Sequence, residues 1–125
     1  MKIVPVIKYK NMEESVLFYT QILDFELKYA ITPLTFPVVN LIKEGSELQL
    51  STLSGDSVFG IAINIYTQNV DALFQKYRER GLDTSQHMNS PVHQSPVDQD
   101  WGIREFYVTD PSGNTLRFGE SILEK

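Results

Sequence analysis

The sequence predicts an α+β fold made of two βαβββ modules that together form a cupped mixed sheet. The apolar pattern runs strand, helix, strand, strand, strand in the first half and repeats that order in the second half. A short sequence motif is also repeated, because Asn-Met-Glu at residues 11–13 is similar to Asn-Val-Asp at residues 69–71. Because 125 residues is an ordinary length for one domain, we expect a single domain over residues 1–125, with modules at about residues 1–54 and 58–125.

The first module is expected to contain one helix among four strands. Asn11 is the predicted helix N-cap, and Glu14 is placed to complete a capping box. Apolar residues at helical spacing then continue to Leu23, where the helix should end. Residues 44–46, Glu-Gly-Ser, have the composition of a tight hairpin turn. The predicted strands are residues 3–7, 25–29, 38–42 and 48–52.

The second module shows the same signals with a longer loop. Asn69 is the second N-cap candidate, an apolar stripe follows it, and Gly81 suits a left-handed C-cap. Residues 83–100 are polar and predict a loop with room for one short strand. Residues 110–113, Asp-Pro-Ser-Gly, carry a strong turn signature. The predicted strands are residues 61–66, 103–109 and 115–118.

Four short stretches give this layout a family resemblance. Ser-Val-Leu-Phe-Tyr at residues 15–19 leads to Leu-Asp-Phe at residues 23–25. Asp24 stands where members of the family named below usually have glycine. Near the end, Trp-Gly-Ile-Arg-Glu-Phe at residues 101–106 precedes Asp-Pro-Ser-Gly-Asn at residues 110–114. The chain resembles the vicinal oxygen chelate superfamily of glyoxalase I, extradiol dioxygenases, fosfomycin-resistance enzymes and bleomycin-resistance proteins, and it is most similar to the bleomycin-resistance branch.

The resemblance also locates four positions for a metal. The enzymes of this superfamily hold a divalent ion with four side chains, commonly two His and two Glu. The corresponding positions here are near Val4, at Gln49, near Gly60 and at Arg117. A hard divalent ion prefers carboxylate or imidazole ligands, and this set offers at most one amide carbonyl. We therefore expect no metal at these positions and no cofactor.

The remaining ionisable residues give no positive support for catalysis. His87 and His93 lie in the polar loop, six residues apart, a spacing that fits neither a helical face nor the usual zinc pairs, so we interpret them as solvated. The carboxylate pairs at residues 13–14 and at 98 and 100 have no nucleophile at a credible spacing. The alternative is a metal-dependent glyoxalase- or dioxygenase-type lyase or isomerase whose ligands are displaced, and a role for His87 and His93 belongs to that alternative.

Six residues are the candidates for ligand binding. Trp101 and Phe36 could offer flat surfaces for stacking, the alternative being a core role for Trp101. Because side chains alternate along a strand, Gln49, Ser51 and Arg117 should point away from the helices. For Tyr107, core packing is the favoured interpretation. For Arg117, an internal pair with Glu47 or Glu105 is favoured over an anionic ligand group. The full set is Trp101, Phe36, Gln49, Ser51, Tyr107 and Arg117.

Charge and composition narrow the class of partner. A formal net charge of -5 argues against nucleic acid and is compatible with a cationic ligand. The longest apolar run, residues 58–63, is far shorter than the roughly 20 residues of a membrane helix, and the start of the chain lacks the features of a signal peptide. The absence of cysteine fits a cytoplasmic protein.

The resemblance and these limits lead to one functional hypothesis. We expect a metal-free binding protein that sequesters a cationic, aromatic small molecule in the cleft of a homodimer, as an antibiotic-resistance protein does. The resemblance implies the homodimer and a cleft between its subunits. A dimer that serves only to bind another protein is a further alternative.

Overall fold

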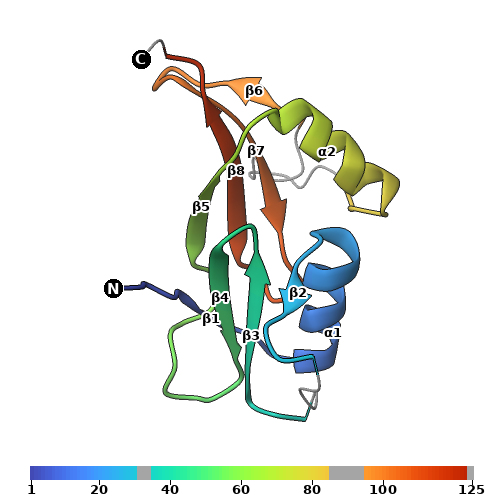
Figure 1. Ribbon diagram of the computed structural model, residues 1–125, viewed down its shortest axis with the longest axis vertical. Coiled ribbons are helices and arrows are strands. Elements are labelled where there is room, and N and C mark those ends of the chain that lie inside the picture. The colour runs from blue at the N-terminus through green and yellow to red at the C-terminus, as the bar shows by residue number, and fades with distance from the viewer. Residues whose placement is uncertain (31–34, 85–94, 124–125) are drawn as a thin grey trace. The chain divides into compact units, whose positions relative to one another are not determined.

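The computed structural model describes residues 1–30, 35–84 and 95–123, and its strands form two four-stranded mixed sheets (Figure 1). The first sheet has the order β1-β4-β3-β2 and the second the order β5-β8-β7-β6. In each sheet the two strands at one end run parallel and the other pairs are antiparallel. The second sheet therefore repeats the first strand for strand, which confirms the predicted α+β fold of two βαβββ modules.

The chain divides into two compact units that differ slightly from the modules. The first unit comprises Met1–Ile61 together with Asp110–Asn114, and the second comprises Ala62–Thr109 with Thr115–Lys125. The turn of the second module is thus part of the first unit. Within the residues that the structure describes, no helix is long and apolar enough to cross a membrane.

In the first unit, the strands are shorter or shifted relative to the sequence prediction. The first strand starts at Val6 and not at Ile3, because Pro5 has no N–H and joins the sheet only through its carbonyl, which accepts from Gln49 N at 2.9 Å. The two-residue hairpin turn is confirmed, since Glu44 and Gly45 both have positive φ. The strands are β1 (Val6–Lys8), β2 (Glu26–Leu27), β3 (Val38–Lys43) and β4 (Ser46–Ser51).

The helix of the first unit is interrupted. Asn11 caps it as predicted, accepting from Glu14 N at 2.9 Å, but no hydrogen bond from the Glu14 side chain to the cap is present. Helix α1 (Met12–Leu17) passes into the π-helical segment η1 (Phe18–Ile22), so the helical segment ends near Leu23 as predicted, but its second half is π-helical. The chain then turns through Asp24, whose φ of 68° is the left-handed conformation that a glycine would adopt at no cost.

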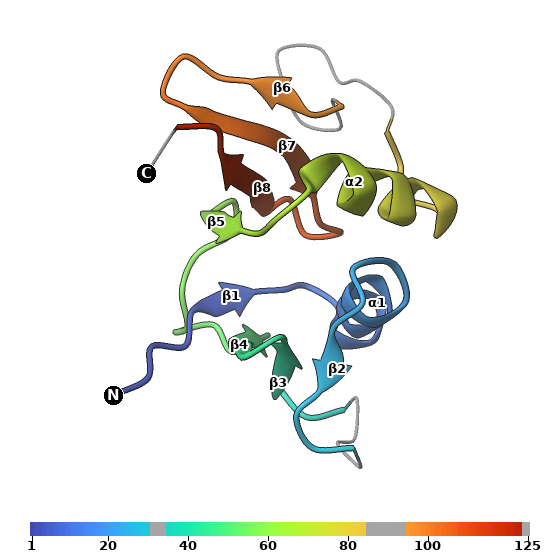
Figure 2. The ribbon, with the colours of Figure 1, turned by 45° about the horizontal axis from the view of Figure 1, so that its top comes forward.

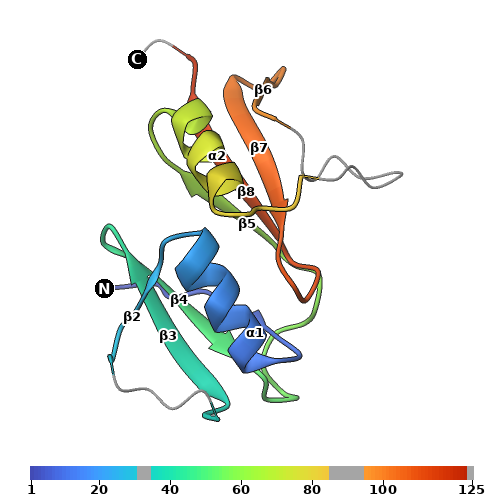
Figure 3. The same ribbon diagram turned by 90° about the vertical axis from the view of Figure 1, so that its right-hand side faces the viewer.

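The second unit is built around helix α2 (Val70–Glu79), shown over its sheet in Figure 3. Asn69 caps it by accepting from Ala72 N, and Gly81 with φ 101° ends it in a Schellman motif, in which Leu82 N donates to Tyr77 O at 2.9 Å. The strands, visible in Figure 2, are β5 (Ala62–Tyr66), β6 (Val97–Asp98), β7 (Ile103–Thr109) and β8 (Thr115–Ser121).

The helix-facing sides of the two sheets pack differently. In the first unit, the strands contribute aliphatic residues such as Leu41 and Leu50, which are fully buried, and the buried rings of Tyr9 and Phe25 contact that of Tyr19 edge to face. In the second unit the core is aromatic, with ring centroids 5.1 to 6.3 Å apart. Its rings are Phe74, Tyr77, Phe106 and Phe118.

The turn after β7 is anchored inside the first unit. Asp110 is buried, and its carboxylate accepts hydrogen bonds from Ser112 N at 3.0 Å and Asn114 N at 2.9 Å. The hydroxyl of Tyr9 donates to the same carboxylate, and that of Tyr19 lies 3.2 Å from it. Burial, together with the neighbouring acidic groups, raises the pKa of both tyrosines well above the ordinary value. The turn signature therefore supplies a buried acceptor as well as a change of direction.

Candidate functional site

Each sheet has a second face that its own helix does not cover. Pairing places Val6, Gln49 and Asn40 side by side on this helix-free face of the first sheet. It places Asn64, Arg117 and Tyr107 in the matching row of the second sheet. Since alternate residues of a strand point to opposite faces, the candidates Gln49, Ser51, Tyr107 and Arg117 all belong to helix-free faces.

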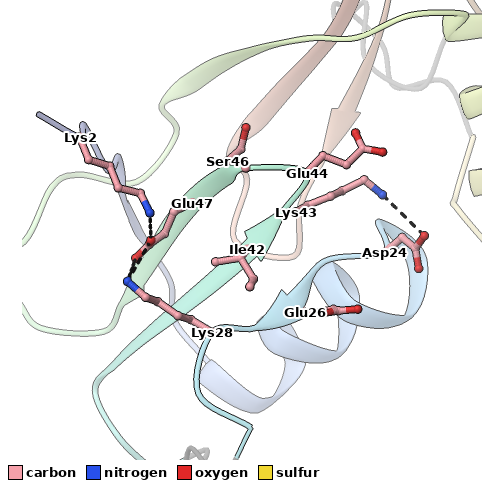
Figure 4. Close-up of a pocket in the computed structure, with 10 residues that line it drawn as sticks. Lys2, Asp24, Glu26, Lys28, Ile42, Lys43, Glu44, Ser46 and Glu47 are labelled. Carbon is pink, nitrogen blue, oxygen red and sulfur yellow. Dashed lines mark hydrogen bonds and ion pairs between the residues drawn. The ribbon is translucent and has the colours of Figure 1, made fainter.

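The helix-free face of the first sheet is organised around Glu47. Its side chain is only 2% exposed, yet it is surrounded by donors. Lys2 Nζ lies at 2.6 Å and Lys28 Nζ at 3.1 Å (Figure 4), and Asn40 Nδ2 lies at 2.6 Å. The hydrogen bond from Lys2, followed by those from Asn40 and Lys28, lowers the pKa of the Glu47 carboxyl to about 2. The contact with Glu47 also raises the pKa of Lys28. This buried carboxylate is therefore ionised and paired.

A cavity of about 510 Å³ opens beside this cluster (Figure 4). Acidic and basic side chains alternate along its lining, and two of them, Lys43 and Asp24, form an ion pair at 3.6 Å. The charged lining residues are Lys2, Lys28, Lys43, Asp24, Glu26, Glu44 and Glu47.

Two of the predicted binding residues in the first unit are engaged internally. Gln49 donates to Asn40 Oδ1 at 3.1 Å and so joins the network around Glu47. Ser51 is fully buried, donates to Asp56 at 2.7 Å and accepts from Leu53 N at 3.1 Å. Ser51 thus fixes the chain at the end of β4.

Phe36 differs from these two because it is exposed. It lies just before β3, is 52% accessible and belongs to the first unit. This exposure is compatible with stacking on a ligand, which stays a prediction.

On the helix-free face of the second sheet, Arg117 has no polar partner among residues 1–30, 35–84 and 95–123. Its Nε atom is buried without a hydrogen bond, and neither of its terminal nitrogens bonds to a residue that the structure describes. The guanidinium carbon lies 5.6 Å from the centroid of the Tyr107 ring. The favoured expectation of a pair with Glu47 or Glu105 is not met, because Glu47 is bound by lysines and Glu105 accepts from the Tyr107 hydroxyl at 2.8 Å.

Tyr107 therefore lies on the helix-free face and not among the residues packed under the helix. Its side chain is half-buried. Burial and, next, the hydrogen bond to Glu105 raise the pKa of its hydroxyl above the ordinary value. At neutral pH the phenol keeps its proton and donates it to Glu105.

Trp101 is also outside the core. It lies in the turn between β6 and β7 and is 60% exposed, which contradicts the alternative that it fills the interior. The turn is closed by Gly102 N donating to Gln99 O at 3.1 Å, and Gly102 adopts a φ of 83°. Trp101 is thus presented on a short, well-bonded turn.

The four positions inferred for a metal hold no ligand set. Val6 on β1 is opposite Gln49, and Asn64 on β5 is opposite Arg117, so Val6 and Asn64 occupy equivalent positions. Two residues earlier, the counterpart of Val4 is therefore Ala62 and not Gly60. None of the side chains at these positions is His, Asp or Glu. In residues 1–30, 35–84 and 95–123, no group of three or more His, Asp or Glu side chains is placed to hold an ion. His87 and His93 lie outside the described residues.

Sequence reasoning missed the role of the residues around Glu47. Asn40 and Glu47 alternate with the apolar residues of β3 and β4, and Lys28 follows β2. The period of two was the available signal, because it places Asn40, Glu47 and Gln49 on one face. Which lysine reaches that face depends on pairing that one sequence does not reveal.

Comparison with known proteins agrees with this architecture. A family model for the Glyoxalase/Bleomycin resistance protein/Dioxygenase superfamily matches residues 4–118. No curated protein sequence matches the chain.

Solved structures resemble the chain over nearly its whole length. A bleomycin resistance determinant encoded on the transposon Tn5 has a TM-score of 0.76 at 14% identity, covering 98% of this chain and 99% of that one. A bleomycin-binding protein solved with bleomycin has a TM-score of 0.72 at 16% identity, covering 97% and 98%. A glyoxalase/bleomycin resistance protein/dioxygenase from Nocardioides has a TM-score of 0.72 at 18% identity, covering 100% and 86%. At these identities the likeness shows the fold.

Proposed function

The chain belongs to the Glyoxalase/Bleomycin resistance protein/Dioxygenase superfamily, and from this premise we propose that it is a metal-free protein that sequesters a small molecule. The ligand would be held without bond breaking, by the helix-free faces of the sheets. The observation that carries the proposal is the side-chain chemistry at Val4, Gln49, Ala62 and Arg117. This set offers amide and guanidinium groups where a metal site would need carboxylates or imidazoles.

The candidate binding residues divide into two kinds. Trp101 and Phe36 are exposed aromatic rings that could stack on a planar part of the ligand. Arg117, Tyr107 and Gln49 offer polar groups on helix-free faces. We assign Ser51 a supporting role, because its hydroxyl is already used within the first unit.

The net charge and the solved relatives suggest the kind of ligand. A formal charge of -5 favours the approach of a cationic molecule. A relative of the same fold was solved with bleomycin. A cationic glycopeptide with an aromatic end is therefore the first probe, and the cleft of a homodimer in the cytoplasm is the place where we propose that it binds.

Intrinsic fluorescence tests this proposal, since Trp101 is the single tryptophan of the chain. Titration with a bleomycin-type glycopeptide is expected to quench or shift the Trp101 emission, and Trp101→Phe, followed by calorimetry, should weaken binding. Absence of any change up to high micromolar concentrations rejects this ligand. Sedimentation of the free and liganded protein tests the dimer.

A metal-dependent lyase or isomerase is the competing function. Elemental analysis of the purified protein decides between them. A stoichiometric divalent ion that disappears in the His87→Ala/His93→Ala double variant would establish a displaced metal site and overturn the proposal.

A further inference from the structure

We propose that Arg117 binds an oxyanion of the ligand, so that the molecule held on the helix-free face of the second sheet carries an acidic group beside its planar part, even where its net charge is positive. This inference rests on the proposed function, because it names the chemistry of the ligand which that function requires. It adds a local anion site to a chain whose overall charge is negative.

The first step is the contrast between two arginines of the same sheet. Arg104, on the helix side of β7, is bound by Asp71 at 2.8 and 2.9 Å and by Asp98 at 3.0 Å. Arg117, on the opposite side of β8, has no carboxylate partner in residues 1–30, 35–84 and 95–123. A buried donor without an acceptor is rare in folded proteins, and an acceptor supplied by a bound ligand is the explanation that we propose.

The second step is that the nearest carboxylate on this face is already occupied. Glu105 and Tyr107 are alternate residues of β7, and Tyr107 is directly opposite Arg117. Glu105 is opposite Gly119, so it is only a diagonal neighbour of Arg117. Glu105 instead accepts from the Tyr107 hydroxyl at 2.8 Å. The phenol thus satisfies the carboxylate, and the guanidinium is left for another anion.

The third step concerns the geometry of the guanidinium. It lies 5.6 Å from the Tyr107 centroid, within the range of a cation–π contact. Such a contact holds the planar fork while leaving its terminal nitrogens free to donate. A held fork matches the two oxygens of a carboxylate or a phosphonate in a bidentate contact. Asn64, paired with Arg117 on β5, is exposed and can add an amide donor.

The test uses four small probes that share one ring. Benzoate and phenylphosphonate carry planar and tetrahedral oxyanions, benzamide is neutral and benzamidine is cationic. The side-chain Nε–H resonance of Arg117, recorded by NMR on arginine-labelled protein, reports the binding directly because this group is buried and unbonded. We expect benzoate or phenylphosphonate to shift it, and the stronger of the two identifies the oxyanion, while benzamide has no effect.

Variants then assign the effect to the guanidinium. Arg117→Gln should weaken binding of the effective anion about 10- to 100-fold, and Arg117→Lys should recover only part of it, because lysine keeps the charge without the fork. Arg104→Gln is the matched control, and anion binding to that variant should stay within about twofold of the wild type. Circular dichroism checks that each variant is folded. If Arg117→Gln does not fold, Arg117→Lys still tests the site.

Different failures have different meanings. If benzamidine or the bleomycin-type glycopeptide binds, and neither anion moves the Arg117 resonance, the anion site is overturned while the proposed binding function stands. Anion binding that is unchanged in Arg117→Gln also overturns the site. If the glycopeptide and all four probes fail to bind, both proposals are overturned.

Discussion

The helix-free faces of the two sheets share strand order and register but differ in whether their charged side chains have partners. In the first sheet, the buried Glu47 is surrounded by Lys2, Lys28 and Asn40, so its charge is compensated within the unit. In the second sheet, Arg117 has no such compensation among the described residues. Gln49 and Arg117 occupy equivalent positions in the two ladders. The repeat therefore reproduces the backbone, and the substitutions on it decide which face has its charge paired internally and which carries a buried guanidinium nitrogen without a hydrogen bond.

The largest expected effect tests whether a buried aromatic strand residue of the second unit is more sensitive to truncation than a buried aliphatic strand residue of the first. Phe106 contacts three aromatic rings and is almost fully buried. Phe106→Ala should lower the free energy of unfolding by about 4 kcal/mol, and Leu41→Ala in the first unit by about 3 kcal/mol. Urea unfolding followed by circular dichroism measures both. A cost below about 1 kcal/mol for Phe106→Ala would contradict the assigned packing.

The next effect tests the turn that the second module contributes to the first unit. Asp110→Ala removes the acceptor of the Tyr9 hydroxyl and of two backbone N–H groups. We expect a loss of about 3 kcal/mol, because several buried donors lose their partner at once. Thermal unfolding measures it. Asp100→Ala makes the same change of charge at an exposed turn residue and should stay within about 0.5 kcal/mol of the wild type; equal losses would show that charge alone matters.

A third effect sharpens the claim that Glu47 is compensated. Its folded pKa of about 2 lies below the ordinary glutamate value, so its contribution to stability is complete above about pH 5 and is lost as the pH falls towards 2. Glu47→Gln should therefore unfold at a lower temperature than the wild type at pH 7 and at nearly the same temperature at pH 2. Melting curves measured across this range check it. A constant difference between the two proteins would rule out the predicted ionisation.

The smallest effect concerns Arg117, which should contribute little to folding. Replacing it by methionine removes a buried donor that has no acceptor, so Arg117→Met should leave the free energy of unfolding unchanged or raise it by up to about 1 kcal/mol. Glu47→Gln, at the paired face, is the comparison that should destabilise at neutral pH. A clear loss of stability in Arg117→Met would instead indicate an internal partner.

Much of the fold could be predicted from the sequence because its signals are local. The caps at Asn11 and Asn69, the positive φ of Gly81 and the turn at residues 110–113 are all set by nearby residues. The π-helical segment could not be predicted, because residues 18–22 carry an ordinary apolar stripe. Its register is chosen by packing of Tyr19 and Leu23, which are fully buried, and by Asp24 at the exit.

The candidate site was less predictable. Alternation along strands placed Gln49 and Arg117 on the helix-free faces, which pairing supports. It could not show that the Tyr107 hydroxyl reaches Glu105, because that contact depends on side-chain conformations of a formed sheet. Alternation also did not show that the Ser51 hydroxyl is used internally, because the loop after β4 brings Asp56 to within 2.7 Å of it.

The buried carboxylate of the β7–β8 turn also affects how the chain acquires its structure during synthesis. Tyr9 leaves the ribosome about one hundred residues before its acceptor does, the separation being 101 positions. Until then the nascent first half holds two phenol groups, of Tyr9 and Tyr19, that it can bury only without their common partner. The amino-terminal half can therefore form its complete core only after a segment near the carboxyl end has been translated. The two halves then fold together although they repeat one architecture.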